Sequence, residues 1–406
     1  MHAPRPSIQG RIAVIGAGIV GSCIALELQR AGATVTLIDR EAPGNGCSFG
    51  NSGALSPSSI APLAMPGVLA SLPAMLLNPE SPLALRLAYL PRAAPWLARF
   101  VRSARPATVH QSAAALAALH HGAVQSHRAL SIEIGVPELF LQRGHLHLYP
   151  DAQALAKDNG SWQLRRAFGY EAERLDRAAI LELEPRIGAR YQCGMYLADH
   201  ATILNPARYV QAVAKTFAGR GGQVLRDEIQ HLARMADGSW RVASAATHAA
   251  FDRVVVAAGA WSRRLLDPLG VRIALESQRG YHVQFAAGPA PVSRTVVLAD
   301  RKIFVTPMET GLRVGGTVEI AGLQRPPNLR RAAILERIAR ASFDGLENVA
   351  STHWMGHRPC MPDSVPLIGP AARQPGLWLA VGHGHLGLTD SVNTAQQLAG
   401  SMSSVR

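Results

Sequence analysis

The sequence predicts an α/β protein, α+β overall, in which a Rossmann-like nucleotide-binding domain carries an inserted domain with a mixed or antiparallel sheet. A strand, a glycine turn, a helix and a second strand follow one another at the start of the chain. Short apolar strands recur much later, at 253–258 and 377–381. Between them, stretches of alternating polarity such as 281–285 and 303–306 are typical of antiparallel strands.

The composition limits the class of protein. A chain of 406 residues is long enough for two or three domains, and its 48% hydrophobic and 17% charged residues exclude wholesale disorder. The formal net charge is +13, but the only lysines are Lys157, Lys215 and Lys302, and no dense basic run marks a nucleic-acid site. We therefore expect no nucleic-acid partner.

The cysteine and proline residues bear on the cellular location of the protein. The four cysteines form no C-x-x-C pair, so neither a metal site nor a disulfide framework is expected. Prolines interrupt the uncharged segment 42–79 every few residues, which argues against a transmembrane helix. The first strand begins within about a dozen residues of the start, which leaves no room for a signal peptide. A cytoplasmic location is predicted.

The first βαβ unit has a specific layout. Residues 11–16 predict a buried strand, residues 22–31 a helix and residues 34–38 a second strand. The turn between the first strand and the helix reads G-x-G-x-x-G, the pattern of a dinucleotide-binding fold.

Each glycine of that pattern has a physical role. Gly16 permits the tight turn, Gly18 lets the backbone approach a pyrophosphate, and Gly21 allows the helix to pack closely on the strand. The helix N-terminus offers unpaired N–H groups to phosphates. Asp39, at the end of the second strand, is placed to accept hydrogen bonds from a ribose diol, which favours NAD or FAD over NADP.

Later segments predict further pieces of the same layer, including a helix at 206–218 with Asn205 as N-cap and a strand at 223–225. The resulting domain assignment is discontinuous. The nucleotide-binding domain takes residues 1–62, 200–272 and 352–406, and the substrate domain takes 63–199 and 273–351.

Residues 81–132 contain six arginines and no acid, and apolar side chains recur there at near-helical spacing from Leu83 to Val101. Two interpretations remain open. One is a solvated basic face over a stripe that packs on the core. The other is a basic amphipathic surface, within 60–105, that rests on the inner face of the cell membrane and could pass electrons to a quinone.

Taken together, these motifs resemble the flavin-dependent D-amino acid oxidase superfamily, and within it bacterial D-amino acid dehydrogenases. The similarity covers nearly the whole chain and rests on IAVIGAGIVG (12–21) with VTLIDRE after it, CSFGNSG (47–53), LSPSSIAPLAMPGVL (55–69), NPESPL (78–83), ETGLRVGGTVE (309–319), WMGHRPCMPDSVPLIG (354–369) and GHGHLGLT (382–389). The resemblance implies FAD, a two-domain fold and oxidation of an amine beside a carboxylate.

The resemblance also implies a set of FAD-binding residues. They are Gly16, Gly18, Ile19, Val20 and Gly21 at the pyrophosphate, Asp39 and Arg40 at the adenosine ribose, Ser48, Asn51, Ser52, Gly53 and Leu55 in a loop near the flavin, Ile229, Ala258, Gly259 and Trp261 around the nucleotide, and Arg358, Gly384, His385, Leu386, Gly387, Leu388 and Thr389 near the flavin ring. The 382–389 loop follows a buried strand and precedes a helix, so its N–H groups can stabilise negative charge; simple helix capping is the alternative.

A substrate carboxylate should bind an arginine, whose planar fork engages two oxygens at once. Arg358 occupies the motif position beside the flavin in the family and is the first choice. Arg279 and Tyr281, at a strand that enters the substrate domain, are second choices. His383 and His385 are further candidates, although a lone histidine is more often a structural group.

Three positions refine the expectation. Related dehydrogenases often carry Thr in place of His385 and Trp in place of Leu388, which argues against plain D-alanine as the substrate. Some amine oxidases carry Arg near position 308, where this chain has Met308, so a glycine- or sarcosine-type pocket is disfavoured. Cys360 is not at the flavin-attachment position of sarcosine oxidases, so noncovalent FAD is expected.

The function that the resemblance implies is oxidative deamination of D-amino acids. Hydride would pass to flavin N5, the imine would hydrolyse to a 2-oxo acid and ammonia, and electrons would pass to a quinone or another acceptor. Alternatives are a dehydrogenase of cis-4-hydroxy-D-proline or other cyclic or secondary amines, and an amine oxidase that uses O2. A nicotinamide-dependent dehydrogenase and a non-catalytic protein with a vestigial nucleotide site are more distant possibilities.

Overall fold

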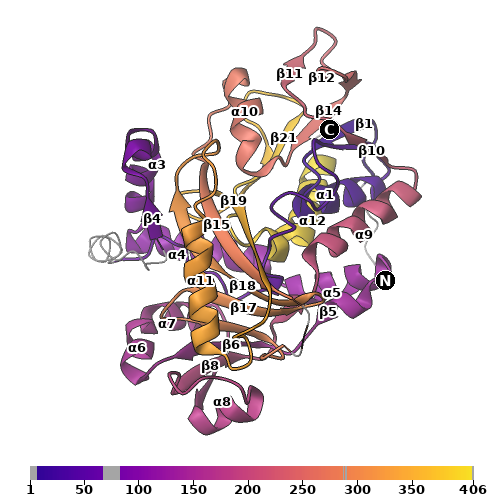
Figure 1. Ribbon diagram of the computed structural model, residues 1–406. Coiled ribbons are helices and arrows are strands. Elements are labelled where there is room, and N and C mark those ends of the chain that lie inside the picture. Colours follow the sequence, from indigo (N-terminus) through magenta and orange to yellow (C-terminus); the bar gives the residue numbers. More distant parts are fainter. Residues whose placement is uncertain (1–6, 67–82, 287, 289, 405–406) are drawn as a thin grey trace.

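The computed structural model describes residues 7–66, 83–286, 288 and 290–404. Two large sheets organise the described chain (Figure 1). The first has the order β10-β2-β1-β14-β21-β20, and the second runs β19-β15-β18-β17-β16-β6-β8-β7, with β4 paired to β18. This arrangement confirms the predicted α/β class with a second, mixed sheet.

The first sheet is a doubly covered nucleotide-binding layer. Its strands are β1 (Arg11–Ile15), β2 (Thr34–Asp39), β10 (Gln223–Arg226), β14 (Arg253–Val256) and β21 (Leu377–Val381), all parallel, with β20 (Leu367–Pro370) antiparallel at the edge. Along β1, Ile12 and Val14 pack against one apolar cluster, whereas Ala13 and Ile15 pack against another. The strand is therefore buried on both faces, as its continuous apolar run predicts.

Different elements cover the two faces. Helices α1 (Ile19–Arg30), α9 (Pro206–Gly219) and α12 (Gly387–Ser404) share the first cluster. The small sheet of β11 (His231–Arg234), β12 (Trp240–Ala243) and β13 (His248–Phe251), together with α10 (Ser262–Leu266), packs on the other face.

Several predicted boundaries are close to those observed. The 377–381 strand is as expected, and the side chain of Asn205 caps α9 by accepting a hydrogen bond from the Arg208 N–H at 3.1 Å. Helix α1 begins at Ile19 and not at residue 22, because the chain enters helical geometry directly after its N-cap, Gly18. Two predicted strands in the other sheet, at 281–285 and 303–306, lie within antiparallel β15 and β17.

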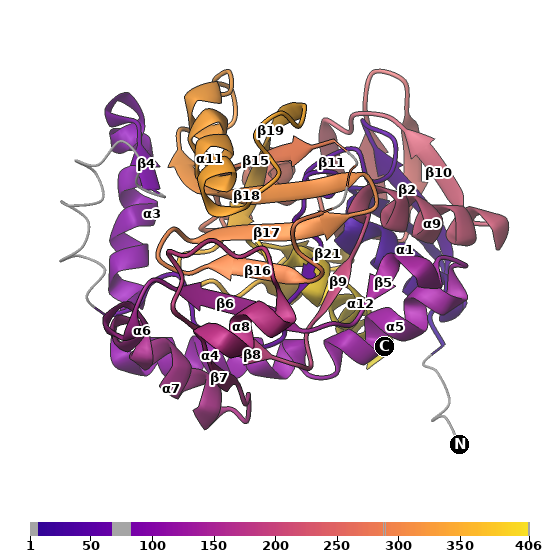
Figure 2. The ribbon, with the colours of Figure 1, turned by 60° about the horizontal axis from the view of Figure 1, so that its bottom comes forward.

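The second sheet is long and curved (Figure 2). Its strands are β19 (Ser351–Cys360), β15 (Glu276–Phe285), β18 (Gly311–Ile320), β17 (Ile303–Met308), β16 (Thr295–Leu298), β6 (His145–Tyr149), β8 (Cys193–Leu197), β7 (Glu173–Asp176) and β4 (Leu83–Leu85). Helix α11 (Leu329–Ser342) packs on one face, where its apolar side chains meet Val283, Phe285 and Val314. The opposite face is left to line a cavity.

Two parts of the chain pack with a layer other than the one to which the predicted domain limits assign them. Strand β19 is paired with β15 of the second sheet, although the predicted limit at residue 352 assigns it to the nucleotide-binding domain. Helices α4 (Pro106–His120) and α5 (Ala123–Glu133) were expected in the substrate domain but pack on α12 of the nucleotide-binding layer. Both differences arise because local sequence specifies an element but not the layer against which it packs.

The basic segment that starts at residue 81 does not form one continuous helix, as the helical spacing of its apolar side chains suggested. Strand β4 and a 3-10 turn at Leu87–Tyr89 precede helix α3 (Leu90–Ser103), and residues 67–82 lie outside the described part, so the motifs placed there are not described. The remaining helices include α6 (Ala152–Lys157), α7 (Asn159–Ala167) and α8 (Arg177–Leu183). Among the described residues, no helix has the length and apolar character needed to cross a bilayer.

Candidate active site

A cavity of about 1250 Å³ lies between the two sheets. The carboxyl ends of β1, β2, β14 and β21 form one side, and the open face of the second sheet forms the other. A crevice outside the carboxyl ends of parallel strands is the usual ligand site of such folds. Segments from every predicted motif in the described chain therefore meet around one space.

The glycine turn forms the nucleotide end of the cavity. A Cβ on Gly21 would lie 1.8 Å from the Gly16 carbonyl oxygen, and one on Gly16, which has a φ of +115°, would lie 2.3 Å from the Ala257 oxygen. Only glycine fits either position. The turn presents the N-terminus of α1 to the cavity, which is a favourable place for phosphate oxygens.

Asp39 and Arg40 lie beside this turn and line the cavity. The Asp39 carboxylate accepts hydrogen bonds from the N–H groups of Ala17 at 2.7 Å and Glu41 at 3.0 Å. It therefore holds the turn itself, in addition to lining the cavity. The guanidinium of Arg40 lies 4.3 Å from the centre of the Trp261 ring, which stiffens this wall.

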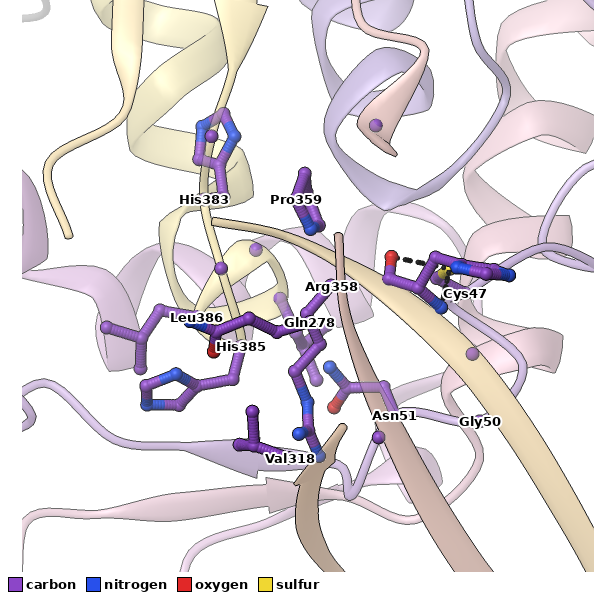
Figure 3. Close-up of a pocket in the computed structure, with 18 of the residues that line it drawn as sticks. Cys47, Gly50, Asn51, Gln278, Val318, Arg358, Pro359, His383, His385 and Leu386 are labelled. Atoms are coloured by element: carbon purple, nitrogen blue, oxygen red, sulfur yellow. Dashed lines mark hydrogen bonds between the residues drawn. The ribbon is translucent and has the colours of Figure 1, made fainter. Parts of the chain in front are cut away.

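The loop at 47–53 is fixed to the second sheet. A Cβ on Gly50 would lie 2.0 Å from the ring of Trp354, and that ring stacks on His282 at 5.0 Å. His282 Nδ1 donates to the Gly50 carbonyl oxygen at 3.1 Å, and the Cys47 thiol meets the backbone of His357 (Figure 3). Burial, with the nearby charge of Arg313, lowers the pKa of His282 to about 3, so its ring is neutral.

Arg313 is a supporting residue that the sequence reasoning missed. Its Nη1 donates to the carbonyl oxygens of Phe49 at 2.9 Å and Asn51 at 2.6 Å, and its Nε donates to the Gln284 side chain at 3.0 Å. Burial lowers the pKa of Arg313 to about 10, which leaves it cationic at neutral pH. The residue lies within the motif at 309–319, but nothing in the sequence showed which backbone it holds.

Arg358 projects from β19 across β15 into the cavity (Figure 3). Its Nη1 donates to the Thr317 carbonyl oxygen at 2.8 Å, and no described carboxylate forms an ion pair with it. The β15–β18 register shifts between Arg279 and Tyr281, and Thr317 in the extra stretch of β18 has a φ of +62°. This bulge turns the Thr317 carbonyl toward Arg358, and strained geometry of this kind recurs at functional sites.

The two second-choice residues lie on the other face of β15. Arg279 donates to the carbonyl oxygens of Gly322, Arg325 and Pro326 at distances of 2.8–3.1 Å and does not line the cavity. The Tyr281 hydroxyl donates to Glu319 at 2.5 Å. Side chains alternate along a strand, so Gln278, Gly280 and His282 face the cavity, whereas the Arg279 side chain and the Tyr281 hydroxyl are directed to the other side of β15. Of the two second-choice residues, Tyr281 nevertheless lines the cavity and Arg279 does not.

The two histidines of the 382–389 loop, His383 and His385, differ in their surroundings. His383 lines the inner wall, but its Nε2 lies 3.1 Å from the Thr394 hydroxyl of α12, which makes it a structural group. His385 is exposed to the cavity, and Figure 3 shows its ring facing the same space as Arg358 and Val318. Desolvation and the charge of Arg358 lower the pKa of His385 to about 4, so the ring is neutral at neutral pH.

Buried groups behind the loop hold the first turn of α12. His127 Nε2 donates to the Leu388 carbonyl oxygen at 2.7 Å, and its Nδ1 lies 3.1 Å from the Tyr209 hydroxyl. His120 and Asp390 form a second buried pair, with 3.0 Å between nitrogen and oxygen. Sequence reasoning found none of these supporting residues, because each contact joins elements that are far apart along the chain.

Most of the predicted cofactor-binding residues line the cavity. They are Gly16, Gly18, Ile19, Val20, Asp39, Arg40, Ser48, Asn51, Ser52, Ile229, Ala258, Gly259, Trp261, Arg358, Gly384, His385, Leu386, Gly387 and Leu388. Gly21, Gly53, Leu55 and Thr389 lie just behind it: Leu55 is fully buried, and Thr389 accepts a hydrogen bond from the Ser56 N–H at 3.1 Å. The glycine cradle, the acid after β2 and the long cavity together fit a dinucleotide that carries a bulky second ring system.

The fold and site thus define a two-domain, dinucleotide-dependent oxidoreductase. Residues 11–400 match the family described as FAD-dependent oxidoreductase, and the chain belongs to that family of flavoenzymes. It is 37% identical over 399 residues to a D-amino-acid oxidase of Bradyrhizobium diazoefficiens, covering 96% of this chain and 94% of that protein. It is 32% identical over 419 residues to a D-amino acid dehydrogenase of Dechloromonas aromatica, covering 98% and 97% of the two chains.

Solved structures share the fold at low sequence identity. Glycine oxidase from Geobacillus kaustophilus superposes with a TM-score of 0.75 at 19% identity, over 98% of this chain and 95% of that one. L-proline dehydrogenase from P. horikoshii gives a TM-score of 0.73 at 18% identity, over 98% and 93%. These neighbours support the two-domain architecture with its Rossmann-like nucleotide-binding fold.

Proposed function

We propose that this enzyme oxidises the amine of D-amino acids, using noncovalently bound FAD. The observation that carries the proposal is Arg358, a cavity-facing guanidinium with no described acid beside it, held opposite the 382–389 loop. An arginine in that state suits a substrate carboxylate, and the names of the similar proteins supply the D-amino acid class.

The chain's own residues would do three things. Arg358 binds the carboxylate in a two-oxygen contact, and the Thr317 carbonyl keeps its guanidinium in place. The 47–53 loop and the Trp354–His282 stack close the wall beside it and exclude water. The first turn of α12 directs N–H groups into the cavity, where they can stabilise negative charge.

Bound FAD would supply the oxidising chemistry, by accepting a hydride from the substrate α-carbon. Neither described histidine of the 382–389 loop suits a strong base: the low pKa of His385 makes it a weak base, and His383 is engaged with Thr394. The substrate amine must therefore lose its proton to solvent or arrive neutral. The released imine hydrolyses in water to a 2-oxo acid and ammonia.

For the electron acceptor we propose a quinone. Trp96, Leu97, Phe100 and Val101 of α3 line the cavity, so an apolar wall leads from it to the basic, arginine-bearing surface of that helix. Leu87 and Leu90 are exposed beside it, which suits peripheral contact with an anionic membrane. An oxidase that uses O2 is the alternative, since one similar protein is named as an oxidase.

The test is anaerobic. The purified yellow protein is mixed with D- and L-amino acids, D-prolines including cis-4-hydroxy-D-proline, and simple amines, while the flavin absorbance is followed. Bleaching by D-amino acids is the expected result, and a flavin that none of them reduces would refute the proposal. Reoxidation is then compared with a soluble quinone and with air, where rapid peroxide release would favour the oxidase. Acid precipitation should release the flavin into the supernatant if it is noncovalent.

A further inference from the structure

The cavity extends beyond Arg358 to an end that the dinucleotide motifs do not explain. It is lined there by His147 of β6, Val297 and Ala299 at β16, Phe304 of β17, and residues of α7 and its flanks. This distal end holds Lys157, Arg165 and Lys302. Two of the three lysines in the whole sequence are therefore at one end of one cavity.

The acids that line the cavity are distributed in the opposite way. Asp39, Glu41, Asp227 and Glu228 lie at the nucleotide end, after β2 and β10. The distal end has Asp158 alone among the described residues, and that carboxylate accepts a hydrogen bond from the Tyr149 hydroxyl at 2.7 Å. Three cations thus face one acid that is already engaged.

Arg165 is the most buried of these cations, and its guanidinium is held in place by three contacts. Its Nε donates to the Ser58 carbonyl oxygen at 3.0 Å, its Nη1 donates to the Ser161 hydroxyl at 2.7 Å, and its guanidinium lies 4.4 Å from the Trp162 ring centre. No described residue accepts a hydrogen bond from its Nη2. The pKa of His147 lies well below its usual value, mainly because the ring is buried. The positive charges of Arg165 and Lys302 also contribute to lowering it.

Lys302 is also close to the Arg358 site. A Cβ on Gly316 would lie 3.2 Å from the Lys302 carbonyl oxygen, and Gly316 directly precedes Thr317, whose carbonyl binds Arg358. Adjacent strands are about 4.8 Å apart. Lys302 and Arg358 both line the cavity and both adjoin the same bulge, so two cationic residues are available to one short molecule.

We propose that the preferred substrates carry a second anionic group, as acidic D-amino acids do, with the side-chain carboxylate bound by Lys302 and Arg165. The proposal rests on the proposed function, because it assigns the other carboxylate to Arg358. It commits to an anion on the side chain, so D-asparagine and D-glutamine, which have nearly the same shape without the charge, should be poorer substrates.

The experiment measures kcat/KM of the holoenzyme, with an artificial electron acceptor, for D-glutamate and D-glutamine and for D-aspartate and D-asparagine. We expect the acidic member of each pair to be favoured about tenfold or more. Raising the salt concentration should reduce that ratio, because screening weakens the charge contact. Lys302→Gln should lower the ratio several-fold, whereas Lys215→Gln, at an exposed site on α9, should not change it.

The results distinguish the preference for acidic substrates from the oxidation of D-amino acids in general. Oxidation of neutral D-amino acids with no preference for the acidic ones, or an equal ratio in Lys302→Gln and Lys215→Gln, would overturn the proposal while the proposed function stands. Failure of every D-amino acid to reduce the flavin would overturn both. Lys302→Glu provides a second variant, in which the preference should shift toward basic D-amino acids. An unchanged preference would overturn the placement of the substrate side chain at Lys302.

Discussion

The guanidinium of Arg358 lies directly over Gly280: a Cβ built on Gly280 would be 2.3 Å from Arg358 Cζ. The missing side chain on β15 makes room for the arginine that reaches across from β19. The bulge in β18 then supplies the Thr317 carbonyl that holds it. Gly280 and the irregular pairing of β15 with β18 thereby place the guanidinium of Arg358 over the sheet, where no described carboxylate pairs with it.

Gly280→Ala should therefore disturb substrate binding more than cofactor binding. The added methyl displaces the guanidinium, so we expect kcat/KM for the preferred D-amino acid to fall by about tenfold or more, mainly through KM. Steady-state kinetics and the flavin-to-protein absorbance ratio measure the two effects. Gly219→Ala, where a Cβ would meet open space, is the matched control. An unaltered KM would contradict the assignment of Arg358 to the carboxylate.

Gly21→Ala should have the opposite profile and abolish retention of FAD. The new Cβ would lie 1.8 Å from the Gly16 oxygen, so α1 must move away from β1 and the phosphate-binding turn must change shape. Purification of a colourless, folded protein, with circular dichroism close to that of the unsubstituted chain, is the expected result. A yellow variant with normal flavin content would show that the turn has room to adjust.

Arg313→Gln should loosen the 47–53 loop. Two partly buried carbonyl oxygens, of Phe49 and Asn51, lose their donor, and each costs less than the roughly 1–3 kcal/mol of a fully buried unsatisfied acceptor. We expect weaker FAD binding and a thermal midpoint lower by several degrees, measured by flavin fluorescence during a melt. Arg241→Gln, an exposed position on β12, controls for the loss of charge. Equal melting of the two variants would exclude a clamp role for Arg313.

The buried His127 should make the free energy of unfolding depend on pH. Burial removes the ring from water, which disfavours its charged form and lowers its pKa to about 4, against 6.5 for the free side chain. The stability it contributes is complete above pH 6.5 and is lost as the pH falls from 6.5 to 4, by up to about 3 kcal/mol.

Chemical denaturation of His127→Gln between pH 7 and pH 4 tests this sign. The slope of unfolding free energy against pH should correspond to roughly one proton fewer than in the unsubstituted chain. His248→Gln, an exposed histidine on β13, should keep the original slope. A slope that is the same in all three proteins would mean that His127 is already protonated when folded.

The sequence by itself determined the local elements of the nucleotide-binding domain. The strands near 11–16, 34–38 and 377–381 and the N-cap at Asn205 follow from apolar runs and backbone chemistry within a few residues. The glycine turn follows from steric limits that involve only its immediate neighbours. The combination of motifs along the chain also indicated the flavoenzyme family to which it belongs.

Tertiary structure decided which of the many arginines face the site. Arg279 and Arg358 were both reasonable carboxylate ligands, but side-chain alternation on β15 turns Arg279 toward α11, whereas pairing with β19 brings Arg358 over Gly280. Arg165 and Lys302 are 137 positions apart and line the same cavity because β17, β16 and β6 are neighbours in one sheet. Periodicity and turn chemistry are local, whereas strand register and layer packing depend on contacts between distant segments, so only the folded chain specifies them.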